Sequence, residues 1–106
     1  MTTALRQRLP NRREHQLFDF EHAGIRYTAG IGCFPDSGSV AEVFLNVSSK
    51  AGSMIDVLSR DSAVLASLAL QHGASVDTLR HALIRNADGS ASGALGRLLD
   101  LLAAPA

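Results

Sequence analysis

Few residues in this sequence combine a reactive type with a useful spacing. Lys50 stands three residues before Ser53, with Gly52 between them, where an apolar helix is expected to begin. A helix N-terminus offers free N–H groups and a positive dipole end, and a lysine adds a full charge. Lys50, Gly52 and Ser53 are therefore the candidate site for a phosphate, a nucleotide or another anion. The simpler interpretation, which we favour, is that Ser53 only caps the helix.

A second candidate is a shallow cleft on the predicted sheet, formed by Arg26, Cys33 and Glu42. A thiol nucleophile at Cys33 needs a neighbouring histidine and carboxylate, and His15, His22 and Glu42 are the groups that could converge on it. Cys33 shares its strand face with apolar residues, so we expect a buried and inert thiol.

No further catalytic or metal-binding pattern is present. The four histidines lack the spacing of metal ligands and no cysteine cluster joins them, so neither a metal nor another cofactor is expected. The chain also lacks a Ser-His-Asp order, a phosphate-binding glycine loop and a dinucleotide-binding fingerprint. These observations favour a binding module over an enzyme.

Arginines are the main candidates for contact with a partner. Residues 1–13 contain no acidic residue but several arginines: Arg6, Arg8, Arg12 and Arg13. This basic N-terminal arm is either a solvated tail or a segment that grips a protein, a nucleotide phosphate or a nucleic acid. Arg80 and Arg85, which we expect to face solvent beside His81, complete a candidate partner surface with Arg12 and Arg13.

The elements that position these residues follow from hydrophobic periodicity. Apolar residues alternate from about residue 15 to 22, again over 25–34, and again over 40–47, with turn sequences between these runs. This pattern predicts a three-stranded antiparallel meander. Ser53 and Gly73 then delimit a long helix that is apolar around most of its circumference, which predicts burial on most sides.

Two shorter helices complete the prediction. Ser75 caps the first, and the second carries the apolar stripe Leu95, Leu98, Leu99 and Leu102. The expected fold is α+β, with the long helix and the two shorter helices packed on one face of the sheet. Residues 14–106 form this single domain, and residues 1–13 precede it as the arm.

Length and charge narrow the function further. The 106 residues suffice for one domain, and 10 basic and 10 acidic side chains cancel. Zero net charge argues against nucleic acid and against an anionic membrane as partners. The single cysteine fits a reducing compartment, and no segment has the length and hydropathy of a membrane span or a signal peptide. We therefore expect a cytoplasmic protein.

The order of these elements resembles the TSCPD domain, a family found alone in bacterial and phage proteins and near the C-terminus of adenosylcobalamin-dependent ribonucleotide reductases. The resemblance spans roughly residues 9–102. It rests on Leu-Pro-Asn-Arg-Arg at 9–13, Ala-Glu-Val-Phe at 41–44, Gly-Ser at 52–53, His-Gly at 72–73 and Leu-Arg-His-Ala-Leu at 79–83.

One motif of that family is missing. Its Thr-Ser-Cys-Pro-Asp sequence should precede the last helix, where this chain has Gly-Ser-Ala-Ser-Gly at 89–93. The cysteine falls on Ala91 and the aspartate on Gly93, so a thiol or metal role of that motif is absent. The cysteines that relay electrons in the reductases are absent as well. The resemblance thus implies a detached, non-redox relative of a reductase domain.

These observations lead to one main hypothesis and two alternatives. The main hypothesis is an accessory or regulatory module of DNA-precursor synthesis that contacts a ribonucleotide reductase catalytic chain, with a nucleotide or anion as a further ligand. The first alternative is a small enzyme or subunit within a ribonucleoside-diphosphate reductase system. The second is nucleic-acid binding through the N-terminal arginines. A homodimer would protect the edges and the uncovered face of a three-stranded sheet.

Overall fold

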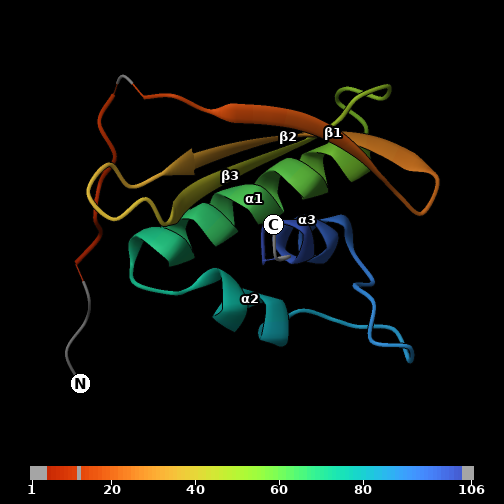
Figure 1. The fold of residues 1–106 in the computed structure, drawn as a ribbon. Coiled ribbons are helices and arrows are strands. Elements are labelled where there is room, and N and C mark those ends of the chain that lie inside the picture. Colours follow the sequence, from red (N-terminus) through yellow and green to blue (C-terminus); the bar gives the residue numbers. More distant parts are fainter. Residues whose placement is uncertain (1–4, 12, 104–106) are drawn as a thin grey trace.

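A three-stranded antiparallel sheet in the order β1–β2–β3 precedes three helices in the chain (Figure 1). A computed structural model of the protein describes residues 5–11 and 13–103. The elements are β1 (Gln16–His22), β2 (Ile25–Cys33), β3 (Val40–Val47), α1 (Met54–Gln71), α2 (Val76–Ala82) and α3 (Ala94–Ala103). This arrangement confirms the predicted α+β class and the meander.

The alternation of side chains divides the sheet into an inner and an outer face. Phe18 lies opposite Ala29 and Phe20 opposite Tyr27, and all four side chains point to the inner face, where the rings of Phe20 and Tyr27 stack at 5.5 Å. A tight turn joins β1 to β2, because Ala23 and Gly24 both adopt positive φ angles of 52° and 77°.

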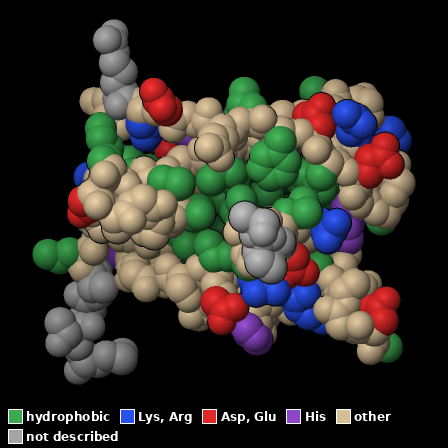
Figure 2. Space-filling model, in the orientation of Figure 1, with side chains coloured by type: hydrophobic (Ala, Val, Ile, Leu, Met, Phe, Trp, Pro, Cys, Tyr) green, Lys and Arg blue, Asp and Glu red, His purple; other side chains and the backbone are tan. Residues whose placement is uncertain are grey.

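The core lies between the inner face and the helices. It combines Ile31, Val43 and Leu45 from the sheet with Ala63 and Ala66 of α1 and Leu98 of α3. Figure 2 shows hydrophobic side chains gathered between the sheet and the helices, with most charged side chains toward the margins. α1 packs closely on β3, whereas α2 packs mainly on α3 (Figure 1).

The ends of α1 are as the sequence predicts. Ser53 is the N-cap and its hydroxyl accepts a hydrogen bond from the N–H of Asp56, while Gly73 follows the C-cap with a φ angle of 103°.

The burial of α1 contradicts the prediction. Its covered side carries mainly small or polar residues, among them Ala63 and Ala66, with Leu70 as a large apolar exception, whereas most of the large apolar side chains point outward. The exposed set comprises Met54, Ile55, Val57, Leu58, Val64 and Leu65.

This orientation has a physical reason, which lies at the edge of the sheet. β3 is an edge strand, and α1 supplies the hydrogen-bond partners that a further strand would supply. The Ser67 hydroxyl accepts from the N–H of Val43 at 2.9 Å and donates to its carbonyl at 3.0 Å. Ser67 therefore faces the sheet beside the small residues Ala63 and Ala66, and most of the large apolar side chains face away from it.

Two more side chains of α1 complete this edge. A carboxylate oxygen of Asp56 accepts from the N–H of Val47 at 2.9 Å, and the amide of Gln71 donates to the carbonyl of Ala41 at 3.2 Å. Because α1 occupies the edge of β3, this edge is closed to a strand of a second chain.

The described part of the N-terminal arm is attached to the domain. The Arg6 guanidinium donates to the side-chain oxygen of Gln71 at 2.7 Å, and the N–H of Gln7 donates to the carbonyl of Gln71 at 2.7 Å. These contacts hold the arm against the C-terminal end of α1.

Candidate functional site

Glu42 is a buried carboxylate on the outer face of the sheet. It lies opposite Gly32 of β2 and its residue is 4% exposed. A Cβ atom at position 32 would stand 2.6 Å from Glu42 Oε2 and 2.8 Å from its Cγ. The glycine therefore provides the space in which the Glu42 side chain lies across β2.

Two residues that precede β1 bind this carboxylate. Arg13 donates to both oxygens, from Nε to Oε2 and from Nη2 to Oε1, the latter at 3.0 Å. His15 Nε2 donates to Oε2 at 2.9 Å, because an ionised carboxylate is only an acceptor. We call these three residues, Arg13, His15 and Glu42, the Glu42 clamp.

The clamp favours the ionised form of its carboxyl group. Burial raises the pKa of Glu42, but the hydrogen bonds from Arg13 and His15 lower it by more, so this pKa lies below its ordinary value. Both oxygens are engaged and the residue is almost inaccessible, so Glu42 is not available as a general base. The clamp instead fastens the end of the N-terminal arm to the sheet. Arg13 is thus paired within the chain rather than offered to a partner, and Arg12 lies outside the described residues.

An apolar patch adjoins the clamp. The His15 ring meets Phe44 edge-on with ring centroids 5.1 Å apart. Phe44 and Leu17 approach each other over Gly30, where a Cβ atom would lie 3.1 Å from Leu17 Cδ2 and 3.2 Å from Phe44 Cδ2. Leu17 is 73% exposed and Phe44 43%. We call Leu17 and Phe44, with the His15 ring beside them, the outer-sheet patch.

The cleft expected from Arg26, Cys33 and Glu42 does not form. Arg26 lies near the start of β2, whereas Gly32, which faces Glu42 of β3, lies near its end. Arg26 instead makes exposed ion pairs with Asp19 and Glu21.

Cys33 is exposed, so the prediction of a buried thiol is wrong. A register shift between Gly32 and Cys33 places Cys33 opposite Val40 at the very end of the strand, where the core no longer covers it. Among the described residues, no hydrogen bond reaches its sulfur.

The alternative catalytic cluster is only partly assembled. His15 and Glu42 meet in the clamp, and Cys33 lines a shallow hollow that Arg13 and His15 also border. His22 lies at the far end of β1, where its Nε2 bonds to the carbonyl of Ser92 at 2.9 Å. The four groups therefore do not converge on one point.

The candidate anion site at the start of α1 already holds an internal carboxylate. Asp56, which is 2% exposed, accepts from the N–H of Gly52 at 2.9 Å as well as from Val47. The hydrogen bond from Gly52 and then that from Val47 lower the pKa of Asp56. Lys50 is exposed, and the Ser53 hydroxyl caps α1 by accepting a hydrogen bond from the N–H of Asp56. This geometry agrees with the capping interpretation that the sequence favours.

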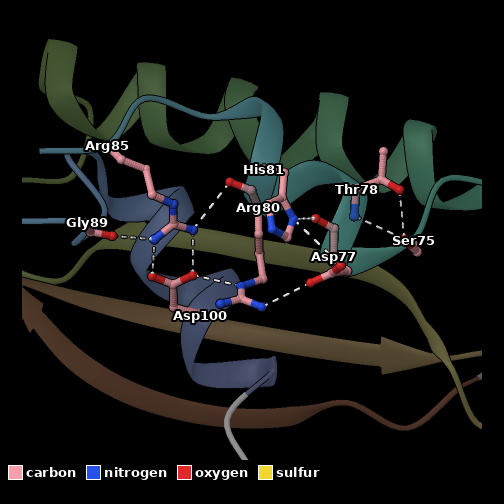
Figure 3. Close-up of polar contacts among 8 residues, drawn as sticks. All are labelled: Ser75, Asp77, Thr78, Arg80, His81, Arg85, Gly89 and Asp100. Carbon is pink, nitrogen blue, oxygen red and sulfur yellow. Dashed lines mark hydrogen bonds and ion pairs between the residues drawn. The ribbon is translucent and has the colours of Figure 1, made fainter.

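Arg80 and Arg85 converge on a carboxylate that the sequence analysis does not single out (Figure 3). Arg85 donates from both terminal nitrogens to the two oxygens of Asp100, at 2.8 and 2.7 Å, and Arg80 Nε donates at 2.8 Å. The hydrogen bonds from Arg85 and then Arg80 hold the pKa of Asp100 far below its usual range.

The expectation of two solvent-facing arginines is therefore wrong. Both guanidinium side chains are 28% exposed, and Arg85 lies beyond the end of α2, where it pairs with Ala91 in an isolated bridge. Arg85 also donates to the carbonyls of Gly89 and Arg80, so the cluster ties α2, the following loop and α3 together (Figure 3). Only His81, 75% exposed, faces solvent as expected.

No pattern in the neighbouring sequence indicates that Asp100 pairs with two arginines or that Arg13 and His15 bind Glu42. The partners of Asp100 lie 15 and 20 residues away, and those of Glu42 lie 27 and 29 residues away. A glycine opposite a strand glutamate is the one pattern that could have indicated a buried outer-face carboxylate.

Within residues 5–11 and 13–103, no cluster of three or more histidine, cysteine or acidic residues could hold a metal ion. None of the helices in that part of the chain is long and apolar enough to cross a membrane. Comparison of the chain with protein-family models, with curated proteins and with solved structures finds no match.

Proposed function

We propose that this protein is a non-catalytic accessory module that acts by contact with another protein. One observation carries the proposal: on the outer face of the sheet, the reactive groups are used internally while large apolar side chains are left exposed. Arg13, His15 and Glu42 satisfy one another, and Leu17 and Phe44 stand uncovered beside them.

The shape of this face suits a protein partner better than a small substrate. Substrate sites are concave and bury most of the ligand, whereas protein interfaces combine an apolar centre with a polar rim. The outer-sheet patch lies on paired strands, and polar side chains of the neighbouring row, such as Asp19 and Thr28, border it. Because the patch is held by the sheet and by the clamp, a partner would meet a preformed surface.

The partner that we propose is the catalytic chain of an adenosylcobalamin-dependent ribonucleotide reductase. This choice rests on the resemblance of residues 9–102 to the TSCPD domain, which accompanies such reductases. The Leu-Pro-Asn-Arg-Arg and Ala-Glu-Val-Phe segments of that resemblance contain Arg13, Glu42 and Phe44, so they coincide with the clamp and the patch. The proposed function includes no binding of an external anion at Lys50 and Ser53, because the Asp56 carboxylate already accepts a hydrogen bond from the N–H of Gly52.

Calorimetric titration of the purified chain into a purified reductase catalytic chain tests the proposal. We expect the substitution Leu17→Glu to weaken binding about tenfold or more, because it places a charge in the apolar centre of the contact.

Leu5→Glu is the matched control, since Leu5 is 92% exposed and lies outside the patch. It should leave the affinity unchanged. Equal affinity of Leu17→Glu and the unsubstituted chain would remove the patch from the proposal. Absence of binding by the unsubstituted chain would refute the reductase as the partner.

A further inference from the structure

We propose that the free edge of β1 binds an extended basic segment of a partner protein as a fourth strand, antiparallel to β1. β1 is the second edge strand of the sheet and pairs with β2 on one side. This inference rests on the proposed function and deepens it, because the Leu17 side chain of the outer-sheet patch belongs to this strand. It assigns a mode of binding, the addition of a strand to an open sheet edge.

The first support is the hydrogen-bonding pattern of β2. The N–H of Ser48, just after β3, donates to the carbonyl of Arg26 at 3.0 Å, so this carbonyl points toward β3. Successive residues of a strand turn their backbone groups to opposite sides. Over residues 25–32, even-numbered residues therefore bond to β3 and odd-numbered ones, such as Ala29, bond to β1. Because Ala29 lies opposite Phe18, the even-numbered residues of β1 bond to β2.

This alternation leaves the odd-numbered residues of β1 with unpaired backbone groups. Leu17, Asp19 and Glu21 turn their N–H and C=O groups to the free edge, and no described residue forms a hydrogen bond with these groups. All three residues are exposed. The N-terminal arm does not cover them, because it leaves β1 in the direction of Glu42 on β3. β1 therefore presents the backbone donors and acceptors that an added strand requires.

The second support is the charge along this edge. Asp19 and Glu21 are two residues apart, so their side chains share the outer face, and both are exposed. Arg26 forms ion pairs with the two carboxylates, at 3.4 and 3.8 Å. Two carboxylates and one guanidinium leave one net negative charge in this group. A cation on a directly opposed residue of a neighbouring strand would stabilise the pairing.

The same charges disfavour a second copy of the chain as the added strand. Asp19 is the central residue of β1. Antiparallel pairing over the full length of two β1 strands therefore places the Asp19 residues of the two copies opposite each other, and Leu17 opposite Glu21. Like charges in directly opposed positions destabilise strand pairing. A basic strand meets no such conflict.

The register of the added strand predicts its sequence pattern. Directly opposed residues of paired strands have their side chains on the same face. From its N-terminus, the strand should carry basic residues opposite Glu21 and Asp19 and an apolar residue opposite Leu17. The two residues between these positions would lie on the inner face, beside the half-buried rings of Phe18 and Phe20, and should be apolar. The expected order is basic, apolar, basic, apolar, apolar.

Amide hydrogen exchange, followed by NMR, tests this proposal with the synthetic peptide Thr-Lys-Val-Lys-Val-Leu-Thr as the probe. At millimolar peptide, the N–H groups of Leu17, Asp19 and Glu21 should exchange about tenfold more slowly, because they gain hydrogen-bond partners. The N–H groups of Phe18 and Phe20 already bond to β2, so slower exchange at alternate residues is the signature of strand addition. Unchanged exchange at Leu17, Asp19 and Glu21 would overturn the proposal.

A charge reversal gives a second readout, the affinity for the peptide. Glu21→Lys should weaken binding about fivefold, because it places a cation opposite a lysine of the peptide. Asp61→Lys is the matched control, since it makes the same change of charge at an exposed position of α1, and it should leave the affinity unchanged. A peptide with glutamates in place of the lysines should bind more weakly. Equal affinity for the two peptides, or an unchanged affinity of Glu21→Lys, would overturn the basic character of the strand.

The peptide experiment requires no reductase, so this inference and the proposed function can fail separately. Slower exchange with the peptide but no binding of the reductase catalytic chain would support strand addition and refute the proposed partner. Binding of the catalytic chain with unchanged exchange at Leu17, Asp19 and Glu21 would refute strand addition and leave the outer-sheet patch as the contact.

Discussion

At the scale of single residues, the outer face depends on a glycine and a carboxylate that need each other. Gly32 leaves the space that the Glu42 side chain fills, Arg13 neutralises the charge that this burial would otherwise leave unpaired, and His15 adds a hydrogen bond to it. Through the clamp, the ionised Glu42 side chain on the sheet holds the end of the N-terminal arm in place.

Substitution of Gly32 tests this dependence. Gly32→Ala should lower the free energy of unfolding by about 1–3 kcal/mol, because its Cβ would overlap the Glu42 side chain. In a Glu42→Ala background, the same substitution should cost little, since the overlapping atoms are gone. Urea denaturation of the four variants of this double-mutant cycle measures the coupling. Additive effects would contradict the described approach of residues 32 and 42.

The clamp also predicts how stability depends on pH. The pKa of Glu42 is lower in the folded than in the unfolded protein, so its contribution is present above its ordinary pKa of about 4.3 and is lost as the pH falls through the folded value. We expect the stability difference between the unsubstituted chain and Glu42→Gln to be largest near neutral pH and to shrink below about pH 4. Chemical denaturation across this range measures the difference. A difference that grows on acidification would contradict the assigned sign.

At the scale of elements, the packing of α1 is decided by the edge of the sheet. The Ser67 hydroxyl hydrogen-bonds to both the N–H and the carbonyl of Val43. The need of these two backbone groups for partners outweighs the preference of Leu58 and Leu65 for burial. A strand edge left without partners would expose N–H and C=O groups to other chains. The helix thus protects β3 at the cost of an apolar outer side.

Removal of one hydroxyl tests this role of α1. Ser67→Ala leaves the N–H and carbonyl of Val43 without their partner, and we expect a loss of about 1–2 kcal/mol in the free energy of unfolding. Ser62→Ala is the control, because the Ser62 hydroxyl bonds only within its own helix, to the carbonyl of Ser59. Thermal and urea denaturation provide the comparison. Equal stability of the two variants would show that α1 does not hold the edge.

The sequence predicts element boundaries better than it predicts contacts. Ser53 and Gly73 act through neighbouring backbone groups, so the ends of α1 can be inferred locally. The exposure of Cys33 depends on a bulge, and the pairing of Asp100 depends on residues brought together only by the complete fold. Hydrophobic periodicity also cannot show which side of an apolar helix will be covered, and α1 is the example here.

At the scale of the whole molecule, the fold has two exposed apolar surfaces on different layers. The outer-sheet patch centres on Leu17 and Phe44, and the outer side of α1 centres on Leu58 and Leu65. The charged cluster around Glu42 fastens the N-terminal arm to the sheet, and the cluster around Asp100 ties α2 to α3. The outer-sheet patch is the surface through which we propose that the chain binds another protein.

The measurement that tests this account most directly is sedimentation velocity of the fluorescently labelled chain, with and without an unlabelled adenosylcobalamin-dependent reductase catalytic chain. We expect the labelled chain to sediment with the catalytic chain, and Leu17→Glu to abolish this shift while Leu5→Glu preserves it. Sedimentation of the labelled chain at an unchanged rate in the presence of excess catalytic chain would contradict the proposed function.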